Sequence, residues 1–339
     1  MSQTNKPRVA IVGFGLIGRV AALMLAEHFH LSIFERDLVS APSSVGTLAA
    51  AMLAPMAESV ICEQDLAELG LEAMALWPEL LAKLDTPVFF QQQGTVIVAH
   101  QQDRGDLLSF QRRLKPLAGH QAQSLDGCGI GALEPELAGR FHQGLYLPCE
   151  GQLDNLAFFA ASLGTLQNMG MCFHEGADAQ IEQGRVNDEA FDWIIDCRGL
   201  DAKAQSPGLR GVRGEVARIY APEVNLQRPV RLMHPRYPLY IAPKPNHEFV
   251  IGATEIESQD RGDITVRSTL ELLSAAYTVH SGFAEGRVMS LRAGLRPAYK
   301  DNRPQISVTD NVIRINGLYR HGFLLAPAVV QQALQQGVL

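Results

Sequence analysis

The sequence predicts an α/β protein in which a Rossmann-like domain carries an inserted domain built mainly on an antiparallel β-sheet. Three observations support this fold class. Near the N-terminus, an apolar strand pattern leads through a glycine-rich turn into a helical pattern, as at the start of a doubly wound sheet. Residues 214–254 change to strand patterns joined by turns. The last part of the chain repeats the order of strand, glycine loop and helix.

The composition limits the class of protein. The 339 residues suggest about two domains. With 29 Lys and Arg against 36 Asp and Glu, the net charge is −7, which disfavours binding of a nucleic acid by a basic face. No apolar run approaches the ~20 residues that span a bilayer, and residues 9–16 are too short and too interrupted by glycine for a secretory signal. We therefore expect a cytoplasmic protein without an integral membrane segment.

The cysteines and histidines predict neither disulfides nor a metal site. Five cysteines are scattered along the chain without a C-x-x-C pair, which suits a reducing compartment. The ten histidines form no H-E-x-x-H and no other metal-ligand spacing. We expect no metal, and no cysteine or histidine stands in an obvious place for covalent attachment of a cofactor.

Apolar periodicity indicates where the elements of the N-terminal half lie. The pattern predicts strands over residues 8–12, 31–34 and 95–99, and helices over residues 19–28, 65–84 and 103–114. Pro78 should kink or restart the second of these helices, because proline lacks the N–H that a helix interior needs.

In the C-terminal half, Asp154 predicts an N-cap for a helix that runs to about residue 169. Strands are predicted over residues 193–196, 215–220, 239–242, 249–253 and 312–315, helices over 268–280 and from about 328, and a turn over 244–247. This order predicts a discontinuous cofactor domain of residues 1–85, 147–210 and 290–339, and a substrate domain of residues 86–146 and 211–289.

The turn after the first strand matches the dinucleotide fingerprint G-x-G-x-x-G. Gly13 permits the tight turn, Gly15 lets the backbone approach a pyrophosphate, and Gly18 lets the helix pack closely on the strand. The helix N-terminus offers N–H groups and a positive dipole end to the same phosphates. Glu35 closes the second strand, where a carboxylate can accept the hydroxyls of an adenosine ribose and disfavours NADP.

FAD and NAD share this fingerprint, and three further features favour FAD. Residues 47–55 form a stretch of mostly small side chains, which suits backbone running beside a flat ring. The strand that turns at Arg198 and Gly199 can bring a second backbone segment near the pyrophosphate. Residues 316–327 supply another glycine loop and helix N-terminus, which can stabilise negative charge on a reduced flavin ring.

A cluster of motifs near the C-terminus is the most specific signal. It comprises residues 294–297 (GLRP), 300–304 (KDNRP) and 319–328 (YRHGFLLAPA). Further motifs are residues 49–54 (AAAMLA), 133–135 (LEP), 213–215 (RGE), 240–243 (YIAP) and 251–254 (IGAT). With these motifs the chain resembles the D-amino acid oxidase superfamily of FAD-dependent amino-acid oxidases, and most closely its glycine oxidases of thiamine biosynthesis.

The resemblance implies roles for individual residues. Arg296 matches the arginine that pairs with the substrate carboxylate, Tyr240 matches a tyrosine that assists it, and Arg320 matches an arginine beside the flavin. These three are the predicted catalytic residues, and the predicted substrate pocket is Met52, Ala54 and Glu255. The residues predicted to bind FAD without a covalent bond are Gly13, Gly15, Leu16, Ile17, Gly18, Glu35, Arg36, Ala50, Ala51, Met52, Leu53, Cys197, Arg198, Gly199, Arg320, His321, Gly322, Phe323, Leu324 and Leu325.

Plainer interpretations stay open for the catalytic residues. Arg296 is consistent with a strand arginine in a salt bridge, Tyr240 with a core tyrosine, and Arg320 with a cap on a carbonyl group. A further group of arginines is interpreted as a solvated face: Arg210, Arg213 and Arg218.

Two positions depart from the family pattern. Glu255 follows the motif at 251–254, where the glycine oxidases tend to have an apolar residue that lines the pocket. This carboxylate can recognise a second amine or a larger polar substrate, or it can simply face water. His321 replaces the asparagine that usually precedes the loop glycine.

The activity that the resemblance implies is oxidative deamination of glycine or a small D-amino acid. The arginine would fix the carboxylate so that the Cα–H points at flavin N5, and water would hydrolyse the imino acid to an oxo acid and ammonia. Oxygen would take the electrons and yield hydrogen peroxide. The alternatives are a D-amino acid dehydrogenase with a quinone acceptor, a secondary-amine oxidase acting on sarcosine-like substrates, or a flavin-binding partner protein without small-molecule turnover. Homo-oligomerisation stays open.

Overall fold

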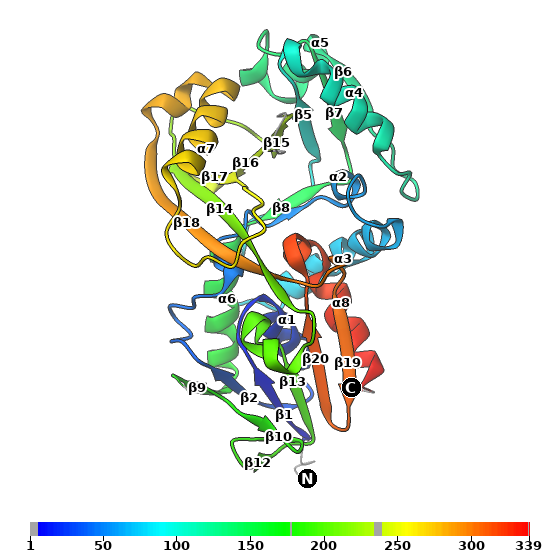
Figure 1. Cartoon of the computed structure of the whole chain (residues 1–339), viewed down its shortest axis with the longest axis vertical. Helices are drawn as coiled ribbons and strands as arrows, with labels where there is room; N and C mark the ends of the chain where they lie inside the picture. The colour runs from blue at the N-terminus through cyan, green and yellow to red at the C-terminus, as the bar shows by residue number, and fades with distance from the viewer. Residues whose placement is uncertain (1–5, 177, 234–238, 338) are drawn as a thin grey trace.

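The computed structural model describes residues 6–176, 178–233, 239–337 and 339. Two large β-sheets organise this part of the chain, one with six strands and one with eight. In Figure 1 the six-stranded sheet and its helices form the lower half of the molecule, and the eight-stranded sheet forms the upper half. The predicted α/β class with a second, mainly antiparallel sheet is confirmed.

The six-stranded sheet has the strand order β19-β20-β13-β1-β2-β9. Its strands are β1 (Arg8–Val12), β2 (His30–Glu35), β9 (Cys172–Glu175), β13 (Trp193–Asp196), β19 (Gln305–Thr309) and β20 (Val312–Asn316). All neighbouring pairs are parallel except β19 with β20. The sheet therefore joins strands from distant parts of the chain, and β1 and β13 have the predicted bounds.

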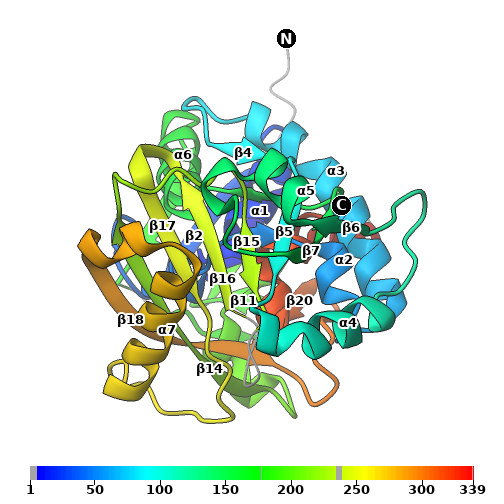
Figure 2. The ribbon, with the colours of Figure 1, turned by 90° about the horizontal axis from the view of Figure 1, so that it is seen from above.

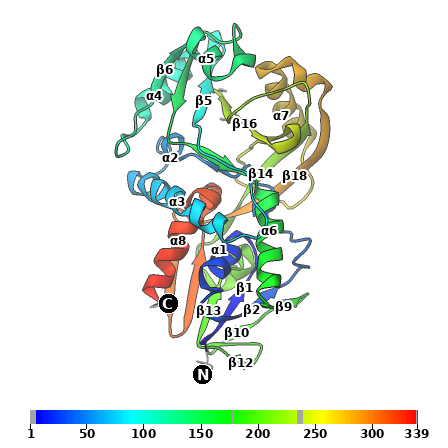
Figure 3. The same cartoon turned by 180° about the vertical axis from the view of Figure 1, so that it is seen from behind.

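Four helices pack together beside this sheet (Figure 3). They are α1 (Leu16–Leu25), α3 (Gln64–Ala82), α6 (Asn155–Asn168) and α8 (Gly322–Gln336). The buried ring of Trp77 lies at their centre, with ring centroids 5.3 Å from Phe158 and 6.1 Å from Phe323. Asp154 caps α6 as predicted, because its carboxylate accepts from two backbone N–H groups of the first turn.

Three of these helices differ from the prediction. Helix α1 begins inside the glycine-rich turn and ends at Leu25, earlier than the predicted span. Helix α3 runs through Pro78 without restarting, and this proline is exposed, so its ring faces solvent. Helix α8 begins at Gly322 rather than near residue 328, and Pro327 lies inside it.

A tryptophan compensates for the proline inside α8. Pro327 has no N–H to donate to the carbonyl of Phe323, four residues earlier. The indole Nε1 of Trp77 donates to that carbonyl over 2.9 Å instead. The helix therefore tolerates the proline, and the hydrogen bond ties α3 to the start of α8.

The eight-stranded sheet has the order β18-β14-β17-β16-β15-β5-β7-β6. Its strands are β5 (Thr95–Val98), β6 (Gln123–Asp126), β7 (Gln143–Leu147), β14 (Arg210–Tyr220), β15 (Val230–Leu232), β16 (Leu239–Lys244), β17 (Glu248–Gly252) and β18 (Arg287–Ala298). Only β15 and β5 pair in parallel. The long strands β14 and β18 pair along their length and descend toward the lower half (Figure 1).

Three helices accompany this sheet. They are α4 (Arg104–Arg113), α5 (Gly127–Leu133) and α7 (Val266–Val279). In the view from above in Figure 2, α7 lies near β17 and β18, whereas α4 and α5 lie near β5 and β7. Buried residues of α7, among them Leu272 and Ala276, join the apolar core of β14 to β17.

Two small sheets and a short helix complete the fold, and the sheet of β10 to β12 lies at the far end of the lower half (Figure 1). One small sheet has the order β3-β8-β4, and another has the order β10-β11-β12. Their strands, with the short helix α2, are β3 (Met52–Leu53), α2 (Pro55–Glu58), β4 (Phe90–Gln91), β8 (Gly151–Leu153), β10 (Ile181–Glu182), β11 (Arg185–Val186) and β12 (Glu189–Ala190). Within the described residues, none of the helices combines the length and apolarity needed to cross a bilayer.

The interpretation of three arginines as a solvated face is wrong for Arg213. Its side chain is buried on β14 and pairs with the buried carboxylate of Glu215 over 2.7 Å. Side chains two residues apart share one face of a strand, which brings the two charges together. Arg218 is also mostly shielded and pairs with Glu248, whereas Arg210 is partly exposed.

Replacing Trp77 with phenylalanine should destabilise α8, because Pro327 cannot donate to the Phe323 carbonyl that Trp77 binds. The W77F variant leaves the Phe323 carbonyl without a donor, and we expect the free energy of unfolding to fall by about 1–3 kcal/mol. In a P327A background, the alanine supplies the missing N–H, so the same W77F change should cost less. Urea denaturation of the four proteins of this double-mutant cycle measures the difference, and equal costs in both backgrounds would contradict the role of Trp77.

Candidate functional site

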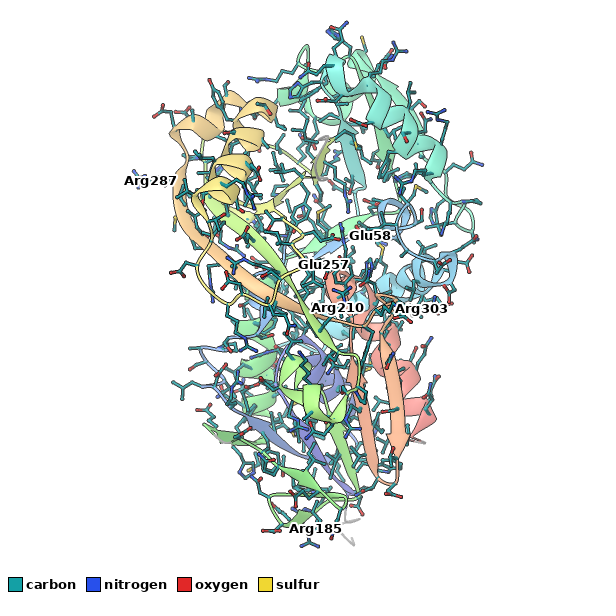
Figure 4. The ribbon with its side chains drawn as sticks, viewed as in Figure 1. Glu58, Arg185, Arg210, Glu257, Arg287 and Arg303 are labelled. Carbon is teal, nitrogen blue, oxygen red and sulfur yellow. The ribbon has the colours of Figure 1, made fainter. Side chains whose placement is uncertain are left out.

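A groove of about 1030 Å³ runs between the two sheets. At one end it is lined by Gly13 and Glu35, at the carboxyl ends of β1 and β2. At the other end it is lined by Tyr240 of β16 and Arg296 of β18. Figure 4 places Glu58, which also lines the groove, where the upper and lower halves meet.

The turn after β1 holds two backbone segments in close contact. Gly13 has a φ of +95°, a conformation that favours glycine, and its N–H donates to the Phe34 carbonyl over 2.9 Å. A Cβ at Gly13 would lie 2.8 Å from the Cys197 carbonyl oxygen, and a Cβ at Gly18 would overlap the Gly13 carbonyl. These two glycines therefore keep β1, β13 and the start of α1 tightly packed at the edge of the groove.

Charged side chains at the end of β2 and after β13 line the same end. The Glu35 carboxylate accepts from the Phe14 N–H over 2.6 Å and from the Asp37 N–H over 3.2 Å. Arg36 and Asp201 both line the groove and form an ion pair over 2.8 Å. That ion pair links the end of β2 to the segment after β13.

The segment after β13 contributes backbone to the groove. The Cys197 thiol donates to the Gly13 carbonyl over 3.0 Å, and burial raises the pKa of this thiol well above its usual value. The Arg198 guanidinium is held by the buried carboxylate of Asp196, with both N–O distances 2.9 Å. Gly199 continues the turn with a φ of +57°.

Small side chains line the middle of the groove along residues 49–54. Ala50 and Ala51 are almost fully buried, and Ala51 has a positive φ of 49°. The Nζ of Lys244 donates to the carbonyls of Ala50 and Leu153 over 2.7 and 2.8 Å, which ties this segment to β16. The prediction of a turn over 244–247 is wrong at Lys244, which ends β16 and is buried, because its ammonium group finds acceptors there.

The guanidinium of Arg296 lies at the inner end of the groove. It donates to the Thr254 carbonyl over 3.2 and 3.3 Å, and it has no carboxylate partner in the described part of the chain. A Cβ at Gly214 would overlap this guanidinium, so the glycine leaves space for it. Tyr240 lines the same end, and burial raises the pKa of its hydroxyl.

Glu58 gathers three nitrogen groups beside this end. Its carboxylate lies 3.1 Å from an Arg231 nitrogen, 3.1 Å from Arg320 Nε and 3.3 Å from His321 Nδ1. Burial would raise the pKa of Glu58, but Arg320, Arg231 and His321 outweigh it and lower that pKa to about 2. Burial lowers the pKa of His321 to about 4, against the opposing attraction of Glu58. Glu58 is thus ionised and His321 neutral near pH 7.

Arg320 also contacts a second carboxylate. Its Nη1 donates to Glu255 over 2.8 Å, and the Glu255 side chain is 43% exposed. Burial raises the pKa of Tyr319, and the nearby Glu255 raises it further. Glu255 is therefore paired with a cation of the site and does not simply face water.

The structure brings most predicted site residues to the groove. Met52 and Ala54 line it, as do Gly15, Leu16 and Ile17 near the turn. The start of α8 lines it through Gly322, Phe323 and Leu324. The predicted cofactor residues that lie behind this lining are Gly18, Leu53 and Leu325.

Sequence reasoning missed three residues of the site or its support. Glu58 and Arg231 received no role, and Lys244 was placed in a turn. A signal existed for Arg231, because a charged residue flanked by two apolar residues of a buried strand must find a partner. Glu58 follows an apolar run in the same way, but its partners lie far away in the sequence.

The residues present fit the predicted FAD. The groove is long, backbone approaches it closely at Gly13 and Gly199, and small side chains flank its middle. The first turn of α1 faces it at one end and the first turn of α8 faces it farther along. A pyrophosphate suits the glycine turn, and a flat ring suits the strip of small residues at 49–54.

Comparisons with known proteins agree with this geometry. A family model described as DAO, FAD dependent oxidoreductase, matches residues 8–333. The putative thiamine biosynthesis oxidoreductase ThiO of Rhizobium etli is 39% identical over 330 residues, which cover 97% of this chain and 96% of that protein. The bifunctional protein ThiO/ThiG of a Synechocystis species is 25% identical over 345 residues, and this chain spans about half of its length.

Solved structures share the fold. Glycine oxidase from Bacillus cereus superposes with a TM-score of 0.81 at 24% identity, covering 98% of both chains. Iminodiacetate oxidase from Chelativorans has a TM-score of 0.78 at 22% identity, covering 96% of this chain and 93% of that one. At these identities the likeness concerns the fold alone.

Substituting Gly18 should weaken the binding of FAD. A Cβ at this position pushes α1 away from the Gly13 carbonyl, so in G18A we expect the dissociation constant of FAD to rise at least about tenfold. Titration of the apoprotein with FAD, followed by flavin fluorescence, measures the change. G105A is the matched control, because a Cβ there meets nothing within 4 Å. Unchanged affinity in a folded G18A protein would contradict the assignment of this turn.

His321 should make the protein lose stability on mild acidification. Its folded pKa is about 4, whereas the ordinary value is 6.5, so the unfolded chain takes up a proton first as the pH falls. The loss begins below pH 6.5 and reaches up to about 3 kcal/mol near pH 4, and it is absent above pH 6.5. Urea denaturation between pH 7.5 and 5 should therefore show a flatter profile for H321N than for the wild type. Parallel profiles would contradict the buried, neutral state of His321.

Proposed function

Because this chain belongs to the DAO family of FAD-dependent oxidoreductases, we propose that it deaminates glycine or another small amino acid oxidatively. The observation that carries the proposal is the Arg296 guanidinium, which faces the groove without a carboxylate partner in the described residues. The charge of such a shielded cation is compensated when an anionic ligand binds to it. The carboxylate of an amino acid is the simplest such ligand.

Arg296 and Tyr240 would hold the substrate carboxylate. A guanidinium presents two parallel N–H groups to a carboxylate, which fixes its orientation as well as its position. Tyr240 keeps its proton because burial raises the pKa of the hydroxyl, so it remains a donor to the same carboxylate. The substrate would thus be held at one end, with its amine and Cα directed along the groove.

The other polar groups of the site set its electrostatics. When bound, FAD supplies the two-electron oxidation of the Cα–N bond. His321 and Tyr240 are neutral near pH 7, and the Glu58 carboxylate is engaged by cations, so none of these side chains serves as an obligatory base in the proposed reaction. The chain contributes orientation, shielding from water and a field of constant charge.

The proposed overall reaction consumes the amino acid, water and oxygen and yields an oxo acid, ammonia and hydrogen peroxide. Support for the substrate class comes from the similarity to the putative ThiO oxidoreductase. Oxygen as the electron acceptor and a cytoplasmic location are parts of the same proposal. Anaerobic titration of the purified protein with glycine, sarcosine and D-amino acids tests the substrate class, because a substrate bleaches the flavin. Comparing peroxide formation with reduction of a quinone analogue tests the acceptor.

Replacing Arg296 should separate substrate binding from cofactor binding. In R296A we expect kcat/KM to fall by about a hundredfold or more, mainly through KM, because a charge-assisted bidentate contact is lost. The flavin content should stay that of the wild type. R287A is the control, since Arg287 lies at the exposed far end of the same strand and points outward in Figure 4. Wild-type kinetics in R296A would refute its role.

A further inference from the structure

Two consecutive residues contact the two arginines of the inner groove. The Thr254 carbonyl accepts from Arg296, and the Glu255 carboxylate accepts from Arg320 over 2.8 Å. Tyr319, beside Glu255, also lines the groove. Glu255 therefore occupies a donor group of Arg320, and both residues line the groove.

The segment around Glu255 is anchored on both sides. Thr254 donates its hydroxyl to the buried Glu215 carboxylate over 3.0 Å and accepts from the Glu215 N–H over 3.0 Å. The backbone groups of Ile256 and Arg213 exchange two hydrogen bonds of 2.9 Å. The fold thus fixes the backbone that carries Glu255, and the contact with Arg320 follows from this placement.

The arginines of the inner groove and the groups that contact them leave one positive charge over. The groups concerned are three arginines, two glutamates and one histidine: Arg231, Arg296, Arg320, Glu58, Glu255 and His321. With His321 neutral, the arginines exceed the glutamates by one. Glu150 lies behind the lining and is fully buried, and burial raises its pKa to about 7. Among the six groups, the guanidinium without a carboxylate partner in the described residues is Arg296, which one carboxylate of a ligand can pair with.

We infer that Glu255 restricts this site to amines and amino acids with a single carboxylate. The inference rests on the proposed function and names its substrate class. The first carboxylate of a substrate pairs with the Arg296 guanidinium. A second carboxylate that reaches toward Arg320 meets the negative charge of Glu255, which repels it and already occupies the guanidinium. Without that charge, Arg320 would keep Glu58 as its carboxylate partner and present free N–H groups to the ligand.

Binding of simple carboxylates tests this inference without turnover. The holoenzyme is titrated with acetate and with malonate, and the change in flavin absorbance gives each dissociation constant. In E255Q we expect the affinity for malonate relative to acetate to rise at least about tenfold, since like-charge repulsion is removed while the shape is kept. E255D, which keeps the charge, should retain the exclusion of malonate.

E257Q is the matched surface control. Glu257 is 70% exposed and pairs with Arg210, beside which it is labelled in Figure 4. The affinity of E257Q for malonate relative to acetate should equal that of the wild type. A ratio that is the same in E255Q and the wild type would overturn the inference.

Substrate kinetics provide the second readout. For iminodiacetate or D-aspartate relative to glycine, kcat/KM should rise at least about tenfold in E255Q. If E255Q instead loses activity on a diamino acid such as D-ornithine and gains none on dicarboxylates, Glu255 recognises a second amine and the inference is wrong. If no amine bleaches the wild-type flavin, the proposed function fails, whereas the acetate and malonate titrations still decide the role of Glu255.

Discussion

A shielded guanidinium without a carboxylate partner in the described residues is the constraint on which the rest of the site depends. An uncompensated charge is costly to remove from water, so the surroundings of Arg296 must lower that cost. Gly214 leaves the space, and the Thr254 carbonyl accepts two N–H groups. Thr254 is in turn bound by Glu215, whose buried charge is balanced by Arg213. A chain of contacts thus runs from a buried ion pair to the cation that an anionic substrate would complete.

The sequence could predict those features that depend on residues close together in the chain. Gly13 needs a positive φ and close backbone contact. A short glycine motif between β1 and β2 is therefore enough to predict its role. The missed contacts join residues far apart in the chain, such as Glu58 with Arg231 and Lys244 with Ala50. No short pattern encodes such pairs. Helix α8 begins earlier than predicted and includes Pro327, whose compensating donor lies on another helix.

The division into cofactor and substrate domains stays a prediction, and the structure explains why its limits are hard to define. Domain boundaries usually fall in exposed linkers that few contacts cross. Here the predicted limits at residues 210 and 290 fall at the start of β14 and inside β18. These strands pair over most of their length and carry Arg296 from the second sheet to the groove. The halves of the molecule are therefore joined by the strands that build the site.

Glu58 couples the assembly of the two halves to the electrostatics of the site. Its carboxylate pairs with Arg231 from β15 of the eight-stranded sheet, and with Arg320 and His321, which follow β20 of the six-stranded sheet. Neither half can supply this set of charges alone. Because Arg320 and Arg231 lower the pKa of Glu58 to about 2 and burial lowers that of His321 to about 4, the charge of the cluster is constant from about pH 5 upward. Tyr240 keeps its proton in the same range, since burial raises its pKa. The pH dependence of turnover near neutrality would then report the substrate amine and the buried Glu150, whose pKa burial raises to about 7, rather than these side chains.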